Sequence, residues 1–508
     1  MKCRTFILLI NMLLLSLCGC KKQKEEISIH QFSSSRIKEL NEYLRAIKQA
    51  YSIPGLSVGI VHKDSVYNST LGIADNEHHL IDSLLPFSAG SISEPVMATA
   101  ILKLVDSGLI KLDDPVQKYL PYFKMADKIN KKVTIRHLLS HTSGIQHYPV
   151  LWDTPNNSDA ALELTTRSIS SQQPKFPIPG SRVVRSPYNY DILADLVSKV
   201  SGKPFEQYMD QQVFKKLGMK SSSFARPVLS VQPFSINNWL SYTSKTDSLY
   251  PYNRENGGSN GLHTSASDLS KWMEMLLNRG LTAQGRYVSK VTFDDFFSFK
   301  YMTSKTAGIT LGWELMTDGN HELFVKKSDI TNFQNQVMLI PEEGIGITFL
   351  SNISAQQISS EIVRNMMNWL NGGKLPKIKT PVGLALGQKF QETGNIDSVI
   401  NLYQSLKRTR NFHYDLSLNA LNFFGNTLFR HVGDQESALK IYNLCITEYP
   451  RSAEAYLSLA NFYIKSRSYS NARLSLEKSR PFLNKFQQER VLDMEQYIKE
   501  KTIDTDPG

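Results

Sequence analysis

The stretch most able to do chemistry is FSAGSISEPVMATAILKLVDSGLIKLDDPVQKYLP, from Phe87 to Pro121. Ser91 stands just before apolar residues that recur at helical spacing. A serine at the start of a helix lies at the positive end of the helix dipole, beside a backbone N–H that can stabilise an oxyanion. Ser91 is therefore a candidate nucleophile.

The residue one turn later, Glu94, allows two interpretations. Its carboxylate could accept the proton of a nucleophilic Ser91, which makes Glu94 a candidate catalytic partner. Ser-x-x-Glu is also the pattern of a capping box, in which both side chains only satisfy backbone N–H groups. Pro95 lacks an amide hydrogen and favours a helix that starts nearer Ser93 or Glu94.

Other polar residues suggest structural roles. His137 and His141 are four residues apart and could share a helix face, as metal ligands do, but no acidic third ligand stands near them. Asp75, Asp113 and Asp114 have the setting of turn residues. We expect no metal and no cofactor.

The elements that must position Ser91 lie in residues 37–370, which mix strand-like and helical patterns. Residues 56–61 and 66–73 predict a β-hairpin, and VMLIPEEGIGITFLSN predicts a second one. Strands at both ends of this region could share one sheet. The helical stretches MATAILKLVDSG and NYDILADLVSKVSG each end at a glycine, Gly108 and Gly202. This pattern predicts an α+β domain.

After a linker-like segment, residues 371–381, strand signals stop. Residues 382–500 contain three aligned stretches, spaced by 39 and then 34 residues, followed by a tail at 501–508. They resemble tetratricopeptide repeats, which would form an all-α domain with a concave surface for a protein partner. A less specific helical bundle that only braces the first domain is the alternative. The aligned columns are Phe390, Phe429 and Tyr463; Val399, Ala438 and Ala472; and Tyr403, Tyr442 and Leu476.

The N-terminus predicts export. Basic residues precede an apolar run that is short for a membrane span, which is typical of a signal peptide over residues 1–19. The run ends in LCGC, which resembles a bacterial lipobox and implies lipid on Cys20, followed by a tether over residues 20–36. A plain anchor helix is the alternative. We expect a membrane-anchored lipoprotein of the cell envelope, on its periplasmic or cell-surface side.

Composition limits the remaining possibilities. A chain of 508 residues with 41% hydrophobic and 21% charged residues indicates a globular protein of two domains. Of four cysteines, only Cys445 would remain as a free thiol after export and lipidation, so we expect no disulfide. The formal charge of +11 is scattered along the chain, and no pattern for nucleic-acid binding is present.

Several motifs in residues 54–352 stand in a recognisable order: GSIS, VTIRHLLSHTSGI, PGSRVV, NGGSNGLHTSASDLSKW and IPEEGIGITFLSN. In this order they resemble the penicillin-binding-protein-like serine hydrolases, a family of class C β-lactamases, D-alanyl-D-alanine carboxypeptidases and esterases. The resemblance implies a β-lactamase/transpeptidase-like fold, with an antiparallel sheet, a helical lobe and a groove between them.

The resemblance also implies catalytic positions that this chain does not keep. Glu94 replaces the family's lysine. The family's Tyr-x-Asn cluster falls on Arg185 and Pro187, and Arg185 could pair with Glu94 instead. Tyr188 and Asn189 lie just beyond and could compensate if the loop bulges.

The family's third cluster, Lys- or His-x-Gly on a strand, falls on Lys326, Lys327 and Ser328. Lys326 matches a substrate-binding cation. Ser328 replaces a glycine that lets a substrate backbone approach closely. Two solvent-facing lysines on an edge strand are the alternative.

These departures favour a degenerate hydrolase domain that binds a ligand or acts as a scaffold. One alternative is a divergent serine hydrolase that acts through Ser91 with Glu94, Tyr188 or Lys326. The other is a protein-interaction module that works through the repeats. The expected partners are a peptidoglycan-derived or other acyl or peptide ligand, a protein on the repeats, and the membrane through Cys20.

Overall fold

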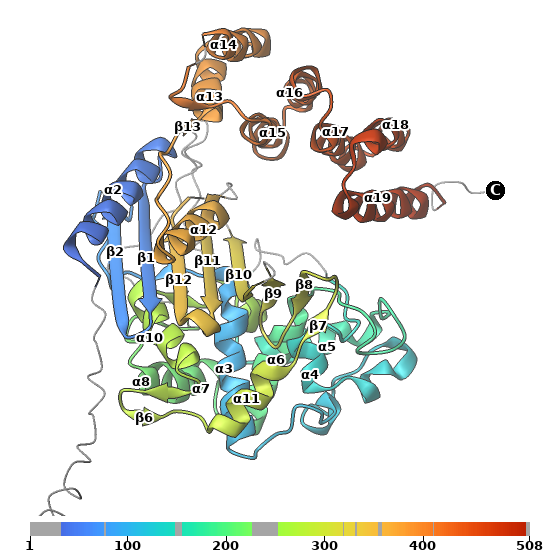
Figure 1. Cartoon of the computed structure of the whole chain (residues 1–508). Helices are drawn as coiled ribbons and strands as arrows, with labels where there is room; N and C mark the ends of the chain where they lie inside the picture. Colours follow the sequence, from blue (N-terminus) through green and yellow to red (C-terminus); the bar gives the residue numbers. More distant parts are fainter. Residues whose placement is uncertain are drawn as a thin grey trace, which may run out of the picture.

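The centre of the first domain is an eight-stranded antiparallel sheet in the order β2-β1-β12-β11-β10-β9-β8-β7 (Figure 1). The computed structural model describes residues 32–75, 78–147, 155–225, 252–317, 320–330, 333–353, 358–409 and 411–503. Strands β1 and β12 pair, so the prediction that both ends of the domain share one sheet is confirmed. The strands are β1 Gly55–His62, β2 Ser65–Gly72, β7 Tyr301–Met302, β8 Ala307–Ile309, β9 Glu314–Thr317, β10 Glu322–Ile330, β11 Phe333–Ile340 and β12 Ile345–Ser351.

Helices cover both faces of the sheet, which explains why its central strands are buried almost throughout. Helices α2 (Ser34–Ala50) and α12 (Ile358–Leu370) pack on one face, and α10 (Ala266–Leu277) packs on the other (Figure 1). Gly59 of β1 permits the approach of α10, because a Cβ there would lie 2.4 Å from Ser270 Oγ. Helix α2 begins at Ser34, within the last residues of the expected tether.

Trp369 joins the two outer helices. The Arg36 guanidinium of α2 lies 4.3 Å from the centre of the Trp369 ring, and Trp369 Nε1 donates a 2.9 Å hydrogen bond to Glu39. Phe32 stacks on the same ring, with 6.2 Å between centroids. The start and the end of this domain therefore meet in one seam.

The helical lobe lies beyond the other face of the sheet. The predicted helix that ends at Gly202 is present as α6, with Gly202 at φ 66°. The lobe contains α3 Ser93–Asp106, α4 Ile135–Leu139, α5 Ala161–Ser168, α6 Tyr188–Ser201, α7 Phe205–Tyr208, α8 Lys215–Leu217, α9 Gly257–Asn260 and α11 Lys290–Ser298. Short pairs β3 Phe87–Ser88 with β4 His263–Thr264, and β5 Leu281–Thr282 with β6 Gly285–Arg286, complete it.

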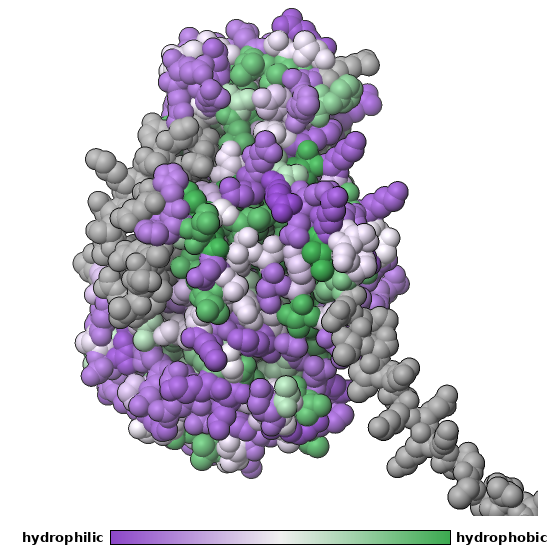
Figure 2. Space-filling model, turned by 90° about the vertical axis from the view of Figure 1, so that its left-hand side faces the viewer, coloured by the Kyte–Doolittle hydropathy of each residue, from purple (hydrophilic) through white to green (hydrophobic). Residues whose placement is uncertain are grey.

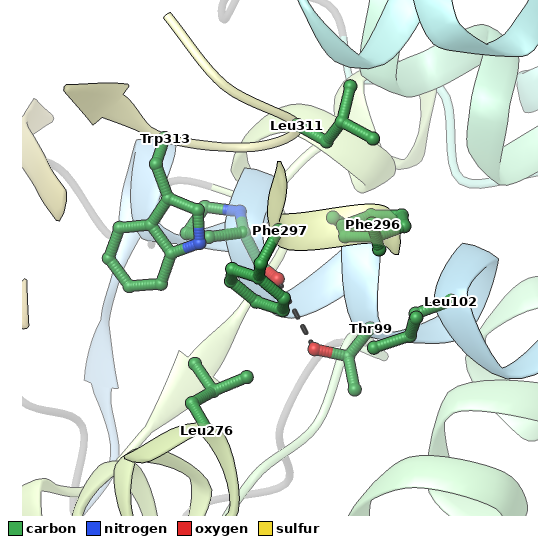
Figure 3. Close-up of a pocket in the computed structure, with 9 residues that line it drawn as sticks. Thr99, Leu102, Leu276, Phe296, Phe297, Leu311 and Trp313 are labelled. Carbon is green, nitrogen blue, oxygen red and sulfur yellow. Dashed lines mark hydrogen bonds between the residues drawn. The ribbon is translucent and has the colours of Figure 1, made fainter. Parts of the chain in front are cut away.

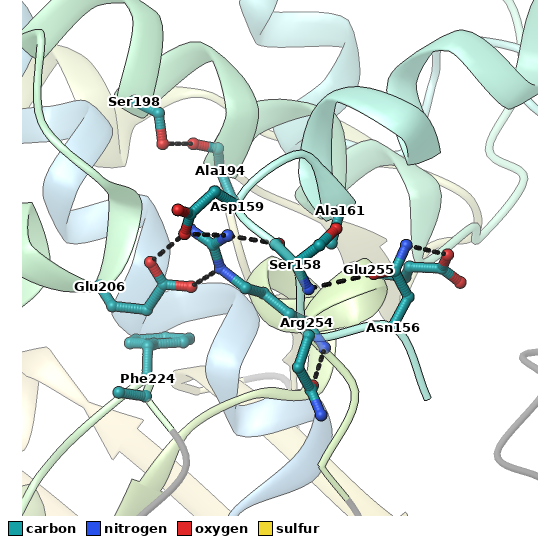
Figure 4. A network of polar contacts seen from close by, with 12 residues as sticks. Asn156, Ser158, Asp159, Ala161, Ala194, Ser198, Glu206, Phe224, Arg254 and Glu255 are labelled. Carbon is teal, nitrogen blue, oxygen red and sulfur yellow. Dashed lines mark hydrogen bonds and ion pairs between the residues drawn. The ribbon is translucent and has the colours of Figure 1, made fainter. Parts of the chain in front are cut away.

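A polar network around Arg254 ties the lobe together (Figure 4). Arg254 Nε donates to Glu206 of α7 at 2.6 Å, and Arg254 Nη1 donates to the Ser158 carbonyl at 2.6 Å. Asn253 accepts from the Asn156 amide at 3.1 Å. Arg254 thus holds the segment that precedes α5 against α7.

The C-terminal region is helical, as predicted. Its helix pairs are α13 Val382–Thr393 with α14 Ile396–Arg408, α15 Leu418–Thr427 and its extension η8 Leu428–Val432 with α16 Gln435–Glu448, and α17 Ala453–Lys465 with α18 Tyr469–Ser479; α19 Lys485–Ile503 follows. Val399, Ala438 and Ala472, which share one aligned column, are all fully buried. The identity of the pairs as tetratricopeptide repeats stays a prediction.

The repeats are attached to the first domain by packing as well as by the chain. Phe423 of α15 packs against the core that α2, α12 and the sheet form. The expected linker ends in β13, Thr380–Pro381, which pairs in parallel with β14, Tyr414–Asp415.

The molecular surface on the side of α2 and β2 is mixed in polarity. Figure 2 shows hydrophilic residues over the lower part of this face and separate hydrophobic patches nearer its middle. Within the described ranges, no helix is both long and apolar enough to cross a membrane. Cys20 and the expected signal peptide lie outside the described residues.

Candidate functional site

The turn before α3 leaves Ser91 partly exposed and buries Glu94. Ser91 lies in a 3-10 turn, Gly90–Ile92, and is partly exposed, whereas α3 begins at Ser93. No side chain caps this helix, so the capping-box interpretation is wrong, and the start near Ser93 is confirmed. Glu94 instead points into the interior, where it finds charged partners.

A buried cluster of charges surrounds Glu94, whose residue is only 4% exposed. Glu94 Oε2 accepts from Lys326 Nζ of β10 and lies 3.2 Å from His141 Nε2 and 3.8 Å from Arg185 Nη2. The ion pair between Arg185 and Glu94 that the charges suggested is therefore present. Arg185 also donates to Glu314 of β9, and its side chain remains 44% exposed.

The cluster keeps Glu94 ionised. Burial alone would raise the pKa of Glu94, but Lys326, His141 and Arg185 outweigh burial and lower that pKa to about 2. Burial also lowers the pKa of Lys326 and of His141 from their ordinary values, with Glu94 opposing it. The carboxylate is thus a very weak base.

A chain of hydrogen bonds orients His141. Asn189 Nδ2 lies 3.0 Å from His141 Nδ1, and Ser143 Oγ donates to Asn189 Oδ1 at 2.6 Å. Since the amide nitrogen can only donate, His141 Nδ1 accepts and the ring hydrogen on Nε2 points to Glu94. Helix α4 ends at Leu139, so His141 does not share a helix face with His137, as a metal pair would require.

The loop before α6 does not rebuild the family's tyrosine and asparagine. The Asn189 amide is fully buried and engaged with His141, so it does not face a ligand. Tyr188 is the first residue of α6 and packs against the core of the lobe. Pro187 immediately precedes that helix.

Strand β10 presses against the turn that carries Ser91. Lys326 is 2% exposed, so the interpretation of two solvent-facing lysines is wrong for it, whereas Lys327 is exposed. Ser328 Oγ accepts a 3.1 Å hydrogen bond from the Ser91 amide. Asn335, directly opposite Ser328 on β11, donates to the Ser88 carbonyl at 2.8 Å.

A small cavity lies behind α3, but it is too small for a ligand (Figure 3). Its volume is about 10 Å³, room for about one water. Thr99, its one hydroxyl, already donates to the Pro95 carbonyl and accepts from Trp272 Nε1. The lining residues are Pro95, Ala98, Thr99, Leu102, Leu276, Phe296, Phe297, Leu311 and Trp313. In the described part of the chain, no three His, Cys, Asp or Glu side chains are placed to hold a metal.

Sequence reasoning missed Glu314, the role of His141 beside Glu94, and the contact between Ser91 and Ser328. His141 stands in the quoted motif VTIRHLLSHTSGI, which was a usable signal. Glu314 carries no motif, and the hydrogen bond from Ser91 to Ser328 depends on how β10 crosses the turn. Cluster members that come from four distant segments cannot be paired from spacing alone.

An antiparallel sheet with a helical lobe, and a serine at the start of the helix that meets the sheet, define a penicillin-binding-protein-like serine hydrolase domain. The sequence model of the family described as Beta-lactamase matches residues 40–360. The chain belongs to this family.

Relatives and solved structures agree with this assignment. The chain is 28% identical over 274 residues to PbpX of Bacillus subtilis strain 168, which is named as a penicillin-binding protein, and 27% identical over 314 residues to Protein flp of Staphylococcus aureus strain MW2. These matches cover 54% and 60% of this chain, and 65% and 61% of the relatives' own lengths.

Among solved structures, a beta-lactamase/D-alanine carboxypeptidase from Pseudomonas syringae has a TM-score of 0.57 at 18% identity, covering 66% of this chain and 99% of that one. A class C beta-lactamase has a TM-score of 0.55 at 19% identity, covering 65% and 96%. At these identities the likeness establishes the fold.

Proposed function

We propose that the beta-lactamase-family domain of this chain is non-catalytic and serves as a ligand-binding or scaffolding module at the cell envelope. The observation that carries the proposal is the buried ion cluster of Glu94. A general base works best with a pKa near the operating pH, and the pKa of Glu94 is held at about 2. Lys326 is the counterion of Glu94 and stands where the family has a substrate-binding cation.

The surroundings of Ser91 support the same proposal. Within the described residues, no side chain forms a hydrogen bond with Ser91 Oγ. A serine hydroxyl without a base is a poor nucleophile. Losing the partners of such a unit typically costs orders of magnitude in rate.

Intact-mass analysis of protein from Lys21 onward tests the proposal, after exposure to a fluorophosphonate and separately to a penicillin. Ser91→Ala is the matched control, and an active penicillin-binding protein verifies the reagents. We expect no stoichiometric adduct. An adduct in the wild type that is absent from Ser91→Ala contradicts the proposal and favours a divergent serine hydrolase.

A gain-of-function pair sharpens this result. Glu94→Lys alone would place a third cation beside Lys326 and Arg185, so it is combined with Arg185→Tyr. If the site has decayed, this double variant should react with the fluorophosphonate faster than the wild type does. If Glu94 works as a base, the double variant should react more slowly.

The ligand that we propose is a peptidoglycan-derived or other acyl or peptide fragment, which would meet the exposed side chain of Arg185. The name of the relative PbpX, a penicillin-binding protein, agrees with this class of ligand. Isothermal titration with muropeptide fragments should detect binding that Arg185→Ala weakens. Equal binding by both proteins would exclude Arg185 from the ligand site.

The remaining parts of the proposal concern attachment and partners. We propose that Cys20 carries lipid, so that Cys20→Ala should move the full chain from the membrane fraction to the soluble fraction. We also propose that the repeats bind a protein. Truncation after Pro381 should abolish the capture of that protein in a pull-down while leaving the first domain folded.

A further inference from the structure

We infer that the hydroxyl of Ser328 occupies the oxyanion position of the site and blocks acyl chemistry at Ser91 independently of Glu94. This inference rests on the proposed non-catalytic function and names a second structural cause for it. It assigns Ser328 as an internal occupant of the place that a reacting carbonyl oxygen would need.

The geometry of one hydrogen bond carries the inference. When a serine attacks a carbonyl, the oxygen becomes negative and needs preorganised N–H donors beside the nucleophile. The nearest such donor is the Ser91 amide itself, and it already donates to Ser328 Oγ at 3.1 Å. Ser328 is 5% exposed, so an incoming oxygen would have to displace a buried hydroxyl.

The hydroxyl fits against the turn because residue 90 is a glycine. Gly90, at φ 51°, lies directly under β10, and a Cβ at this position would be 2.1 Å from Ser328 Oγ and 2.7 Å from Ile330 Cγ2. On the other side of the turn, Asn335 holds the Ser88 carbonyl. Paired residues of β10 and β11 therefore fix both ends of the segment that leads into α3.

Three substitutions at Ser328 separate the effect of its hydrogen-bond acceptor from the effect of its side-chain volume. Ser328→Gly removes both the hydroxyl and the Cβ that fill the position. Ser328→Ala removes the acceptor and keeps the Cβ, whereas Ser328→Thr keeps a hydroxyl and is the matched control. All three leave Glu94 and its cluster unchanged.

The first measurement is hydrogen exchange at the Ser91 amide, followed by NMR on the chain labelled with ¹⁵N-serine. We expect exchange about tenfold faster in Ser328→Gly and Ser328→Ala, as loss of one hydrogen bond predicts, and unchanged exchange in Ser328→Thr. The Ser259 amide, which donates to Asp191 at 2.9 Å, is the internal reference. Unchanged protection of Ser91 in Ser328→Gly would overturn the inference.

The second measurement distinguishes an occupied oxyanion position from a simple brace. The background Glu94→Lys, Arg185→Tyr, Pro187→Asn is prepared with Ser328 and with Ser328→Gly, and the rate of fluorophosphonate modification of Ser91 is compared. In this reaction Ser91 Oγ displaces fluoride from phosphorus, its proton passes to the base, and the phosphoryl oxygen needs the freed N–H. We expect the glycine form to react about 10²-fold faster, the typical value of one oxyanion donor.

Equal rates, including no reaction in either form, would overturn the inference. If the protein with the three background substitutions does not fold, the hydrogen-exchange rates of the single Ser328 variants test the inference instead. The proposed function is tested separately, because it fails if the wild type reacts at Ser91. If the wild type does not react and the glycine and serine forms of the background react equally, the Ser328 inference fails while the proposed function stands.

Discussion

The two halves of the chain bury polar groups in different ways. The sheet-containing domain buries ionisable side chains, among them Glu94, Lys326 and Asp191. Among the described side chains of the repeats, the buried polar ones are uncharged: Asn422, Thr427, Ser437, Ser475 and Ser479. Burial also raises the pKa of the Cys445 thiol to about 12, so this free cysteine stays neutral.

The difference shows that the two regions are stabilised by different interactions. Stacked helix pairs gain stability by packing their apolar faces against one another, and a charge in that interface would be desolvated without compensation. A buried ion pair is weak evidence for stability, because desolvation offsets most of its attraction. Under the function proposed above, the charges beside Ser91 are the remains of a reactive site rather than a means of holding the fold together.

The largest expected effect comes from separating the charges. Lys326→Met should lower the free energy of unfolding of the first domain by about 3 to 5 kcal/mol, because it leaves Glu94 buried without its closest cation. Glu94→Leu combined with Lys326→Met should recover that loss, since it removes both charges. Urea unfolding measures both variants, and a double variant as unstable as the single one would contradict the role of the pair.

An apolar truncation in the repeats should be comparably large but insensitive to pH. Leu421→Ala removes a fully buried side chain and should cost about 2 to 5 kcal/mol. Because no buried ionised group is affected, this cost should be constant from about pH 5 to 8, measured by urea unfolding. A pH-dependent cost would break the contrast between the two halves.

The stability of the first domain should depend on pH through Glu94. The pKa of Glu94 is about 2 in the folded chain against an ordinary value of 4.5, so its stabilisation is present above pH 4.5 and is lost as the pH falls toward 2. The difference in unfolding free energy between the wild type and Glu94→Gln should be about 3 kcal/mol at neutral pH and shrink over this range. A constant difference would show that Glu94 is not held ionised.

Asp191 should behave in the opposite way. Burial raises the pKa of Asp191 well above its ordinary value, so the folded state is penalised as the pH rises above that value. Asp191→Asn keeps the acceptor for the Ser259 amide and should increase the melting temperature at pH 7 but not at about pH 3. A lower melting temperature at pH 7 would mean that the carboxylate is stabilised by its surroundings.

The smallest effect is expected at an exposed ion pair of the repeats. Lys440 Nζ lies 3.1 Å from Asp397, and both side chains are well exposed. Lys440→Ala should change the unfolding free energy by no more than about 0.5 kcal/mol in a thermal or urea titration. A larger loss would mean that exposed charges contribute to the repeats as buried ones do to the first domain.

Much of the fold followed from residue patterns. The hairpins of β1 with β2 and of β11 with β12 are strand-like runs with a turn between them, and the helix that ends at Gly202 has a clear stop signal. The departures from the family motif were also visible, because Glu94 and Arg185 stand at fixed positions in it. The sequence thus indicated both the scaffold and its altered site.

Of the contacts that surround Glu94 in the altered site, the ion pair with Arg185 was predicted from the sequence and the others were not. His141 reaches Glu94 from a backbone with φ 54°, a conformation that spacing does not reveal. Ser328 meets the Ser91 amide only because β10 crosses the turn closely. Such contacts depend on how closely a strand packs against a turn that is distant in the sequence. The local residue pattern does not show this distance.

The seam at Trp369 has a mechanical consequence. The chain enters the first domain at α2 and leaves it at α12. The contacts of Trp369 with Arg36 and Glu39 hold these two helices together. A pull between the N-terminus and the repeats would therefore act on this seam before it reached β10 or α3. Tension on the protein would be absorbed at the seam, and the turn at Ser91 would keep its shape.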